Sequence, residues 1–175
     1  MFSSFLTGVG VDGTNDFGIF TSSGLVARAG EQAPGTGGAV FSDFVSPNLN
    51  DAGEVAFESV LTGAGVGITN NSGIFAQLAD GTLELILRKG DMFDVGGGDL
   101  RTIAGLNLFD GLDDNGGDLA FLASFTDGSQ GLFTADFSSL NGPLPDDPIG
   151  VPVPAPLALI GLGLGAVSLV SRRRG

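Results

Sequence analysis

Residues 2–20, FSSFLTGVGVDGTNDFGIF, recur as residues 57–75, FESVLTGAGVGITNNSGIF. The two stretches align without a gap and are identical at 12 of 19 positions. In each, glycine-rich turn sequence separates short apolar segments, a pattern typical of β structure rather than of helices. The duplication therefore predicts that the chain is built from a repeated β unit.

The repeat extends beyond this stretch. Leu25–Glu31, LVARAGE, returns as Leu85–Asp91, LILRKGD, with a longer hairpin before the second copy. A third unit appears where NDAGEVAF, residues 50–57, matches DNGGDLAF, residues 114–121, and where Gly-Ile-Phe at 73–75 matches Gly-Leu-Phe at 131–133. The period is about 55–64 residues. We expect about four strands a unit: one near Phe41 or Leu106, one ending in the Ala-Phe pair, one beginning Gly-Ile-Phe and one ending Arg-x-Gly-acid.

Short apolar and β-branched segments bounded by turn residues locate the individual strands. In residues 55–61 and 83–87 the apolar residues alternate, which predicts strands with one buried face. No sustained helical period occurs before residue 151. The predicted strands are Ile19–Thr21, Leu25–Arg28, Val40–Val45, Glu54–Leu61, Ile74–Leu78, Leu83–Lys89, Arg101–Phe109, Asp118–Phe125 and Leu132–Phe137.

A single four-stranded sheet cannot bury both of its faces, so neighbouring units should stack as in a propeller or solenoid. The fold class expected for residues 1–135 is all-β, an incomplete propeller-like array of about two and a half four-stranded repeats. Each Asn/Asp-x-x-Gly segment should form a turn, with the Asx side chain capping the backbone and glycine taking a positive φ. The motif residues are Asn50, Gly53, Ala56, Phe57, Asp114, Gly117, Ala120 and Phe121.

These motif residues resemble the tandem NxxGxxAF repeat proteins, a group that carries interchangeable C-terminal anchors. In the third unit Asp114 replaces the asparagine. The resemblance implies a propeller-like fold and an exported context.

The alignment also bears on the start of the chain. Phe2 aligns with Phe57, so the first unit lacks a counterpart of residues 50–56, and residues 1–20 show no secretory signal pattern. We therefore expect the C-terminal portion of a longer protein. About two and a half units cannot close a ring, so the portion should expose open strand edges and be prone to aggregation.

Residues 136–150 change to Pro, Asp, Gly and Ser and are predicted to form a linker. Residues 151–170 are twenty uncharged positions, which as a helix would span about 30 Å, the thickness of the bilayer hydrocarbon. Arg172, Arg173 and Arg174 follow, and such clusters stay on the cytoplasmic side. The tail at 151–175 thus predicts a transmembrane helix with its C-terminus inside and the body outside; the alternative is a buried helix of a soluble domain.

Val151, Pro152, Pro154 and Ala155, followed by an apolar run and the arginine cluster, resemble the PEP-CTERM sorting signal in its VPLPA-CTERM variant. Val153 stands where the name-giving pattern has Glu. The resemblance implies a bacterial cell envelope protein, processed near the proline motif by an exosortase-type membrane protease in an organism that makes exopolysaccharide.

Composition excludes several chemistries. All 20 acidic residues precede Pro148, whereas the body has only four cations, Arg28, Arg88, Lys89 and Arg101, so nucleic acid is not expected as a partner. The absence of Cys and His removes thiolate and imidazole metal sites and His-dependent triads. Trp and Tyr, which stack on sugars in many carbohydrate-binding modules, are also absent.

The carboxylates could still act in catalysis or bind a cation. Glycosidases use two carboxylates a few ångströms apart, but Glu31 and Asp91 recur at corresponding turns, as structural residues do. The loop at 110–118 concentrates oxygen ligands for Ca²⁺ but lacks the EF-hand spacing, so a solvated acidic turn is the default reading. The Ca²⁺ candidates are Asp110, Asp113, Asp114 and Asp118.

The sequence therefore predicts a non-enzymatic, exported protein of the cell surface or exopolysaccharide matrix, with a structural or interaction role and no cofactor. Two alternatives stay open. One is an extracellular binding or hydrolytic propeller whose site lies in missing N-terminal repeats. The other is a single-pass membrane protein that keeps its anchor permanently.

Overall fold

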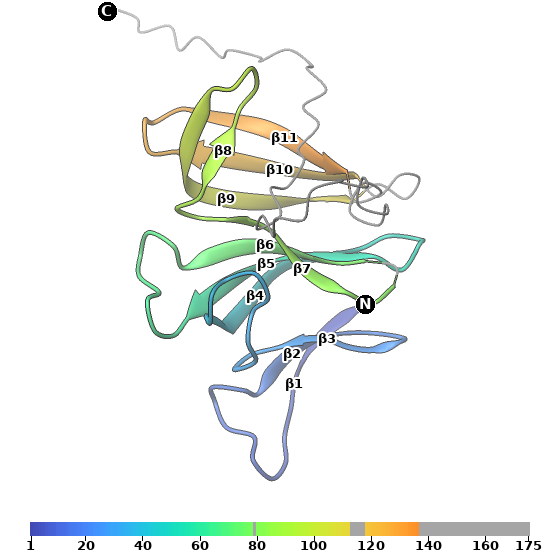
Figure 1. Cartoon of the computed structure of the whole chain (residues 1–175). Coiled ribbons are helices and arrows are strands. Elements are labelled where there is room, and N and C mark those ends of the chain that lie inside the picture. The colour runs from blue at the N-terminus through green and yellow to red at the C-terminus, as the bar shows by residue number, and fades with distance from the viewer. Residues whose placement is uncertain (79, 113–117, 137–175) are drawn as a thin grey trace, which may run out of the picture.

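The computed structural model describes residues 1–78, 80–112 and 118–136, and within them every regular element is a strand (Figure 1). The N-terminal sheet holds β1 (Phe2–Phe5), β2 (Phe17–Thr21) and β3 (Gly24–Arg28). The central sheet holds β4 (Val40–Leu49), β5 (Val55–Thr62), β6 (Ser72–Gln77) and β7 (Leu83–Arg88). The C-terminal sheet holds β8 (Met92–Asp94), β9 (Leu100–Leu112), β10 (Asp118–Phe125) and β11 (Gln130–Asp136). The all-β prediction is confirmed.

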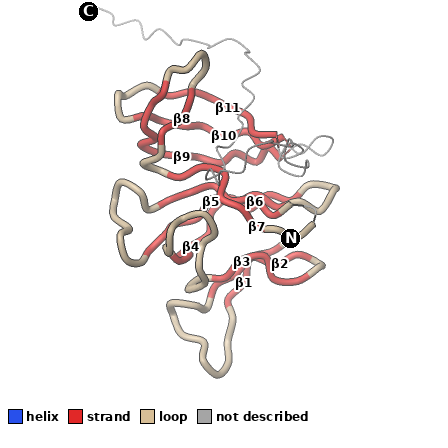
Figure 2. The backbone as a smooth tube through the Cα atoms, in the orientation of Figure 1, coloured by secondary structure: helices blue, strands red, loops and turns tan. Residues whose placement is uncertain are grey.

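The three sheets are antiparallel and lie one above another in chain order (Figure 1). In each sheet, strands that follow one another in the chain are hydrogen-bonded neighbours. Figure 2 shows connecting loops on both sides of this stack, with the loop between β1 and β2 projecting below it. The C-terminal sheet is curled into a half-barrel, so that β8 passes in front of β9 and β10 (Figure 1). Phe93 of β8 fills the curl, with its ring centroid 4.7 Å from that of Phe133.

The duplicated sequence folds into the same hairpin register twice. Phe2 lies opposite Phe20 in the β1–β2 pair, and Phe57 lies opposite Phe75 in the β5–β6 pair. The third unit repeats the relationship with Phe121 opposite Phe133. The equivalence that the alignment predicted is therefore present in the strand pairing.

The loops of the first two units are equivalent as well. Asn15 bridges its loop by accepting from the Asp12 N–H and donating to the Gly10 carbonyl, at 2.8 and 3.0 Å. Asn70 does the same with Gly67 and Gly65, at 2.7 and 3.0 Å.

The arginine of each Arg-x-Gly-acid segment then braces this loop. Arg28 Nε donates to the carbonyl of Asn15 at 2.6 Å, and Arg88 Nε donates to that of Asn70 at 2.9 Å. The Arg-x-Gly-acid segment is thus an architectural element. The observed strand ends at its arginine in both units, which for β7 is one residue before the predicted end at Lys89.

Two hydrophobic clusters hold the sheets together. One joins Ile19, Val26 and Ala27 of the N-terminal sheet to the central sheet. The other joins the central sheet to the C-terminal sheet through Ile74, Ile86 and Leu87. In the repeat alignment these three residues are the counterparts of Ile19, Val26 and Ala27. The prediction that units stack against one another is confirmed for these three sheets.

The central sheet is apolar on both faces. Phe75 packs in the cluster with the N-terminal sheet, whereas Ile74 on the opposite face packs against the C-terminal sheet. Val55, Ala56 and Phe57 are all fully buried. The prediction of one buried face for residues 55–61 was therefore wrong at the start of β5, because a sheet lies on each side of it.

Other strand assignments also differ from the predictions. β1 and β8 were not predicted; β8 is only three residues long. β4 continues past Val45 to Leu49 because Ser46 takes a φ of 48° at a register shift, and this bulge accommodates Pro47 within an extended strand. The Ala-Phe pair lies near the start of β5, not at its end.

The predicted tail lies outside the described residues, as does the predicted linker beyond Asp136. Within the described ranges no helix is long and apolar enough to cross a membrane.

Candidate functional site

The Asn-x-x-Gly turn before β5 is a closed hydrogen-bond unit. Asn50 accepts the Glu54 backbone N–H at 2.9 Å and donates its amide to the Glu54 carboxylate at 2.8 Å. The Asn50 and Glu54 main chains also bond at 3.1 Å, and Gly53 has a φ of 88°. Asn50 and Glu54 are both buried. The turn therefore acts as the asparagine cap that the sequence predicted, and its acid has a structural partner.

This turn delivers the next two motif residues into separate interfaces. Ala56 belongs to the cluster with the C-terminal sheet, and Phe57 belongs to the cluster with the N-terminal sheet. In the third unit Phe121 is buried and Ala120 is half-buried. Asp114 and Gly117 lie outside the described residues.

Three exposed acids form another recurring turn, Asp-Gly-Thr/Ser. The carboxylates of Asp12, Asp80 and Asp127 accept the backbone N–H two residues onward at 2.9, 2.8 and 2.8 Å. Hydrogen bonds to the charged form favour ionisation, and they lower the pKa of all three carboxyls. These carboxylates stabilise loops, which is a different role from that of a general acid.

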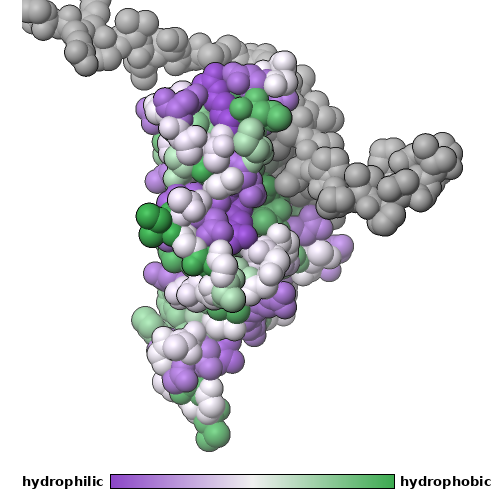
Figure 3. Space-filling view, turned by 60° about the vertical axis from the view of Figure 1, so that its left-hand side comes forward, coloured by the Kyte–Doolittle hydropathy of each residue, from purple (hydrophilic) through white to green (hydrophobic). Residues whose placement is uncertain are grey.

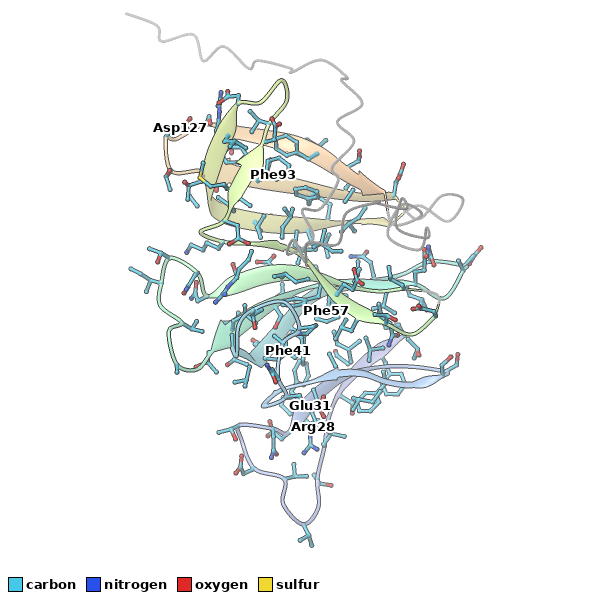
Figure 4. All side chains as sticks on the ribbon, viewed as in Figure 1. Arg28, Glu31, Phe41, Phe57, Phe93 and Asp127 are labelled. Atoms are coloured by element: carbon cyan, nitrogen blue, oxygen red, sulfur yellow. The ribbon has the colours of Figure 1, made fainter. Side chains whose placement is uncertain are left out.

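Arg101 ties together two loops of the C-terminal sheet near Asp127 (Figure 4). Its guanidinium contacts Asp99 at 2.6 Å, the Ser129 hydroxyl at 2.7 Å and Asp127 at 3.5 Å. The hydrogen bond that Arg101 donates to the Asp99 carboxylate is the main cause of the raised pKa of Arg101.

Among the residues that the structure describes, two acids have a raised pKa. Glu58, half-buried on β5, has its pKa raised by desolvation, although the Leu108 N–H, donating to it, acts in the opposite direction. Partial desolvation likewise raises the pKa of Asp91, and the charge of Arg88 opposes that effect. Across the part of the chain that the structure describes, no three acidic residues gather as a cation site would require.

Of the four Ca²⁺ candidates, the structure describes the side chain of Asp118 alone. Asp113 and Asp114 lie outside the described residues, as does the side chain of Asp110, and Asp118 is exposed at the start of β10.

A cleft of about 580 Å³ opens between the central and C-terminal sheets, around residues 88–91. Arg88 lines it but is held by two carbonyls, those of Asn70 at 2.9 Å and Thr36 at 3.0 Å. Gly90 and Asp91 bond through their main chains to Ile103 at 2.8 and 2.9 Å. The cleft is therefore a seam where the two sheets are joined, with Lys89 and Asp91 at its walls.

The exposed apolar residues mark a different kind of site. We call Phe2, Phe20 and Leu25 the N-terminal face: Phe2 is 59% and Leu25 46% exposed, whereas Phe57 and Phe75, the counterparts of Phe2 and Phe20, are 0% exposed. Phe57 and its neighbour Phe41, both labelled in Figure 4, lie buried between the central and N-terminal sheets.

The opposite end of the stack is open too. We call Leu122, Leu132 and Thr134 the C-terminal face; Leu122 and Leu132 lie opposite each other in the β10–β11 pair. Leu132 is 67% exposed, and its counterpart Ile74 is 0% exposed. The sequence predicted open strand edges but not these exposed faces. The repeat alignment was the signal that could have located them, because it pairs the exposed Phe2 and Leu132 with the buried Phe57 and Ile74.

On the side of the molecule drawn in Figure 3, hydrophobic atoms form small separate patches among hydrophilic ones.

Fold and site together define a class: a β-repeat protein of stacked antiparallel sheets, with turn acids committed to architecture and apolar faces open at its two ends. Residues 1–140 match the family of unknown function DUF7453, and the chain belongs to that family. No curated protein and no solved structure matches the chain.

Proposed function

We propose that this protein is an exported component of a bacterial cell surface or exopolysaccharide matrix, with a structural or interaction role. The observation that carries the proposal is the sequence of motifs in the tail: Val151, Pro152, Pro154 and Ala155, then a bilayer-length apolar run, then Arg172 to Arg174. An exosortase-type membrane protease sorts the chain and cuts it near the proline motif. Before cutting, the chain is a single-pass intermediate with its C-terminus in the cytoplasm.

The body supports an interaction role rather than a catalytic one. Its buried acid Glu54 is bonded to Asn50, and exposed acids such as Asp12 and Asp127 are bonded within their turns. The chain has no His or Cys to supply a neutral-pH base or nucleophile. What the body does offer to a partner is apolar sheet surface at its ends.

The repeated interfaces favour a propeller-like array as the finer description of the fold. One three-stranded and two four-stranded sheets stack in chain order, and Ile19 in one interface has Ile74 as its counterpart in the next. A unit that is apolar on both faces needs neighbours on both sides, which is the physical basis of repeat folds.

Mass spectrometry of the mature C-terminus tests the sorting proposal. In a bacterium with an exosortase, the full chain joined behind an export signal should be recovered from the envelope or matrix fraction as a species lacking Arg172–Arg174. In a strain without the protease it should keep them. Pro154→Ala should also preserve the tail, whereas Val153→Ala, outside the matched residues, should be processed normally.

Two outcomes would overturn the proposal or select an alternative. Recovery of the uncut chain from the cytoplasm would contradict it outright. An envelope protein that keeps Arg172–Arg174 whether or not the protease is present would instead be a permanent single-pass membrane protein.

A further inference from the structure

We infer that the cleft between the central and C-terminal sheets binds an acidic sugar unit of a glycan, with Lys89 as the cation that pairs with the sugar carboxylate. The inference deepens the proposed interaction role and rests on it for the source of the glycan. Its physical basis is the cleft, however, and not the sorting tail. Its test and that of the sorting proposal can therefore fail separately.

Positive charge gathers at this cleft in an otherwise acidic chain. Two of the four cations of the body, Arg88 and Lys89, line the cleft, whereas Asp91 is the one acid in its described lining. Arg88 donates to two carbonyl oxygens, which carry no formal charge. In the part of the chain that the structure describes, both ion pairs belong to Arg101. Lys89 therefore lines the cleft without a carboxylate paired to it.

The repeat shows that a lysine is not required to build this seam. Ala29 stands at the position of Lys89 in the first unit and is 3% exposed, within the cluster that joins the first two sheets. The main chain joins the sheets in the same way at both seams, at Phe41 in the first and at Ile103 in the second, with bonds of 2.8 and 2.9 Å each. Alanine therefore suffices for the architecture, and the lysine has another role.

The segment that follows the seam takes a different course in the two units. In the first unit Ala33 and Ala39 lie in the same cluster as Ala29. In the second unit Phe93 stands at the position of Ala33 and fills the curl of the C-terminal sheet instead. The second seam holds a cleft of about 580 Å³, which falls within the usual size of small-ligand sites.

Hydroxyl side chains make up much of the polar lining. Thr69, Thr102 and Thr126 line the cleft, and Thr102 stands where the first unit has Val40. The Thr102 hydroxyl donates to the Met92 sulfur at 3.2 Å, so its oxygen is left to accept. A threonine hydroxyl can donate and accept hydrogen bonds, as the hydroxyls of a sugar do. The lining therefore suits a hydroxylated ligand.

The charges and the remaining lining select the class of ligand. An ammonium pairs with a carboxylate, and the Asp91 carboxylate accepts from ligand hydroxyls while it weakens the hold on the anion. Ile68, 82% exposed, offers an apolar wall to the C–H surface of a sugar ring. A sugar that bears one carboxylate meets all of these groups. Its recognition does not depend on Trp or Tyr, which the chain lacks.

The first unit supplies substitutions that the fold already accepts. Lys89→Ala and Thr102→Val install the residues of the first seam, so both variants should stay folded. Lys89→Arg keeps the positive charge, and Asp91→Asn removes the carboxylate from the cleft lining. Val9→Asp is the matched control, because it changes the net charge by the same amount as Lys89→Ala. Val9 is fully exposed in the β1–β2 loop and does not line the cleft.

The measurement is an NMR titration of the isotope-labelled full chain in mild detergent, which keeps its apolar tail dispersed, with glucuronate as the probe. Saturable shifts are expected for the amides of residues 68–70, 88–91 and 102–104. Glucose has the hydroxyls without the carboxylate, and acetate has the carboxylate without the hydroxyls. Each should bind about tenfold more weakly than glucuronate, because each lacks one class of hydrogen bond.

The variants separate the contributions of charge and hydroxyl. Lys89→Ala should weaken glucuronate binding about tenfold and leave glucose binding unchanged, because the lysine acts on the carboxylate. Lys89→Arg should retain most of the affinity. Thr102→Val should weaken both sugars, Asp91→Asn should tighten glucuronate binding, and Val9→Asp should match the wild type.

Three results would overturn the inference: no saturable shift with glucuronate, shifts that spare residues 88–91, or an affinity that Lys89→Ala and Val9→Asp change alike. Acetate binding as tightly as glucuronate would also contradict it, because the cleft would then hold any small anion.

A glucuronate oligomer distinguishes a unit of a glycan from a free sugar acid. The oligomer should bind at least as well as the monomer, and its exclusion from the cleft would contradict binding of a glycan. A chain that binds glucuronate but keeps Arg172–Arg174 in the presence of the protease would refute the sorting proposal alone. A chain that is cut and exported but binds no glucuronate would refute this inference alone.

Discussion

The ring of Phe75 stacks on that of Phe57, 5.7 Å away between centroids, and both are sealed between two sheets. The same stack formed by Phe20 and Phe2 is partly open to solvent. A duplicated sequence has thus produced one local structure in two environments. The difference between them is the presence of a covering sheet, which buries one phenylalanine pair and leaves the other partly exposed.

Phe75→Ala should destabilise the fold by about 3–5 kcal/mol, the usual cost of removing a fully buried phenylalanine. Phe20→Ala, at the equivalent but half-buried position, should cost clearly less. Denaturant unfolding of both variants gives the comparison. Equal losses would mean that the two stacks are buried alike, contrary to the structure.

Gly73→Ala should destabilise the central sheet by about 1–3 kcal/mol, the typical cost of overpacking. A Cβ at this position would lie 2.9 Å from the Leu87 carbonyl and 3.2 Å from the Phe75 ring, which packs over the glycine. Gly67→Ala is the control, since its Cβ would meet nothing within 4 Å. If thermal unfolding showed both variants equally stable, the close approach at Gly73 would be wrong.

Asn50→Ala should lower the free energy of unfolding by about 1–3 kcal/mol, because it leaves the buried Glu54 carboxylate without its amide donor. Glu54→Gln keeps an oxygen that can accept from Asn50 and should be better tolerated. The stabilities of the two variants and of the double variant form a cycle. Additive effects would show that the two side chains do not act as a pair.

Glu58→Gln should be more stable than the wild type at neutral pH. Desolvation raises the pKa of Glu58 above its ordinary 4.5, so the folded state holds this proton more tightly than the unfolded chain. The wild type therefore loses stability as the pH rises from the ordinary value through the raised one, and the loss persists above it.

Glutamine stays neutral and avoids that loss, so the stability difference should vanish as the pH falls below 4.5. Urea unfolding of both proteins across this range measures it. A difference that grows as the pH falls would mean that Glu58 is stabilised as a carboxylate instead.

Much of the fold could be predicted from sequence because the repeat carries pairing information. Once Phe2–Phe20 aligned with Phe57–Phe75, the two hairpins had to share a register. β1 nevertheless escaped prediction as a strand, since Phe-Ser-Ser-Phe has no marked alternation and pairs because β2 lies beside it. β8 escaped because three residues between glycine-rich turns give no periodic signal.

Burial was harder to predict than strand position. The alternation of Val55, Phe57 and Leu61 located one buried face, but nothing local to Ala56 or Ile74 shows that a second sheet covers the other face. The turn role of Asn50 followed from chemistry, since Asx caps and positive-φ glycine are local preferences. Its pairing with Glu54, and the seam around Arg88, depend on contacts that sequence patterns do not encode.

The central claim is that the terminal tag carries the β body out of the cytoplasm. It is tested most directly with a reporter enzyme that is active only outside the cytoplasm, joined to the full chain behind an export signal. Inserted in the exposed β1–β2 loop near Val9, the reporter should be active; fused after Gly175, beyond the arginine cluster, it should be silent. Activity of the fusion after Gly175 would place that end outside the cytoplasm and contradict the account.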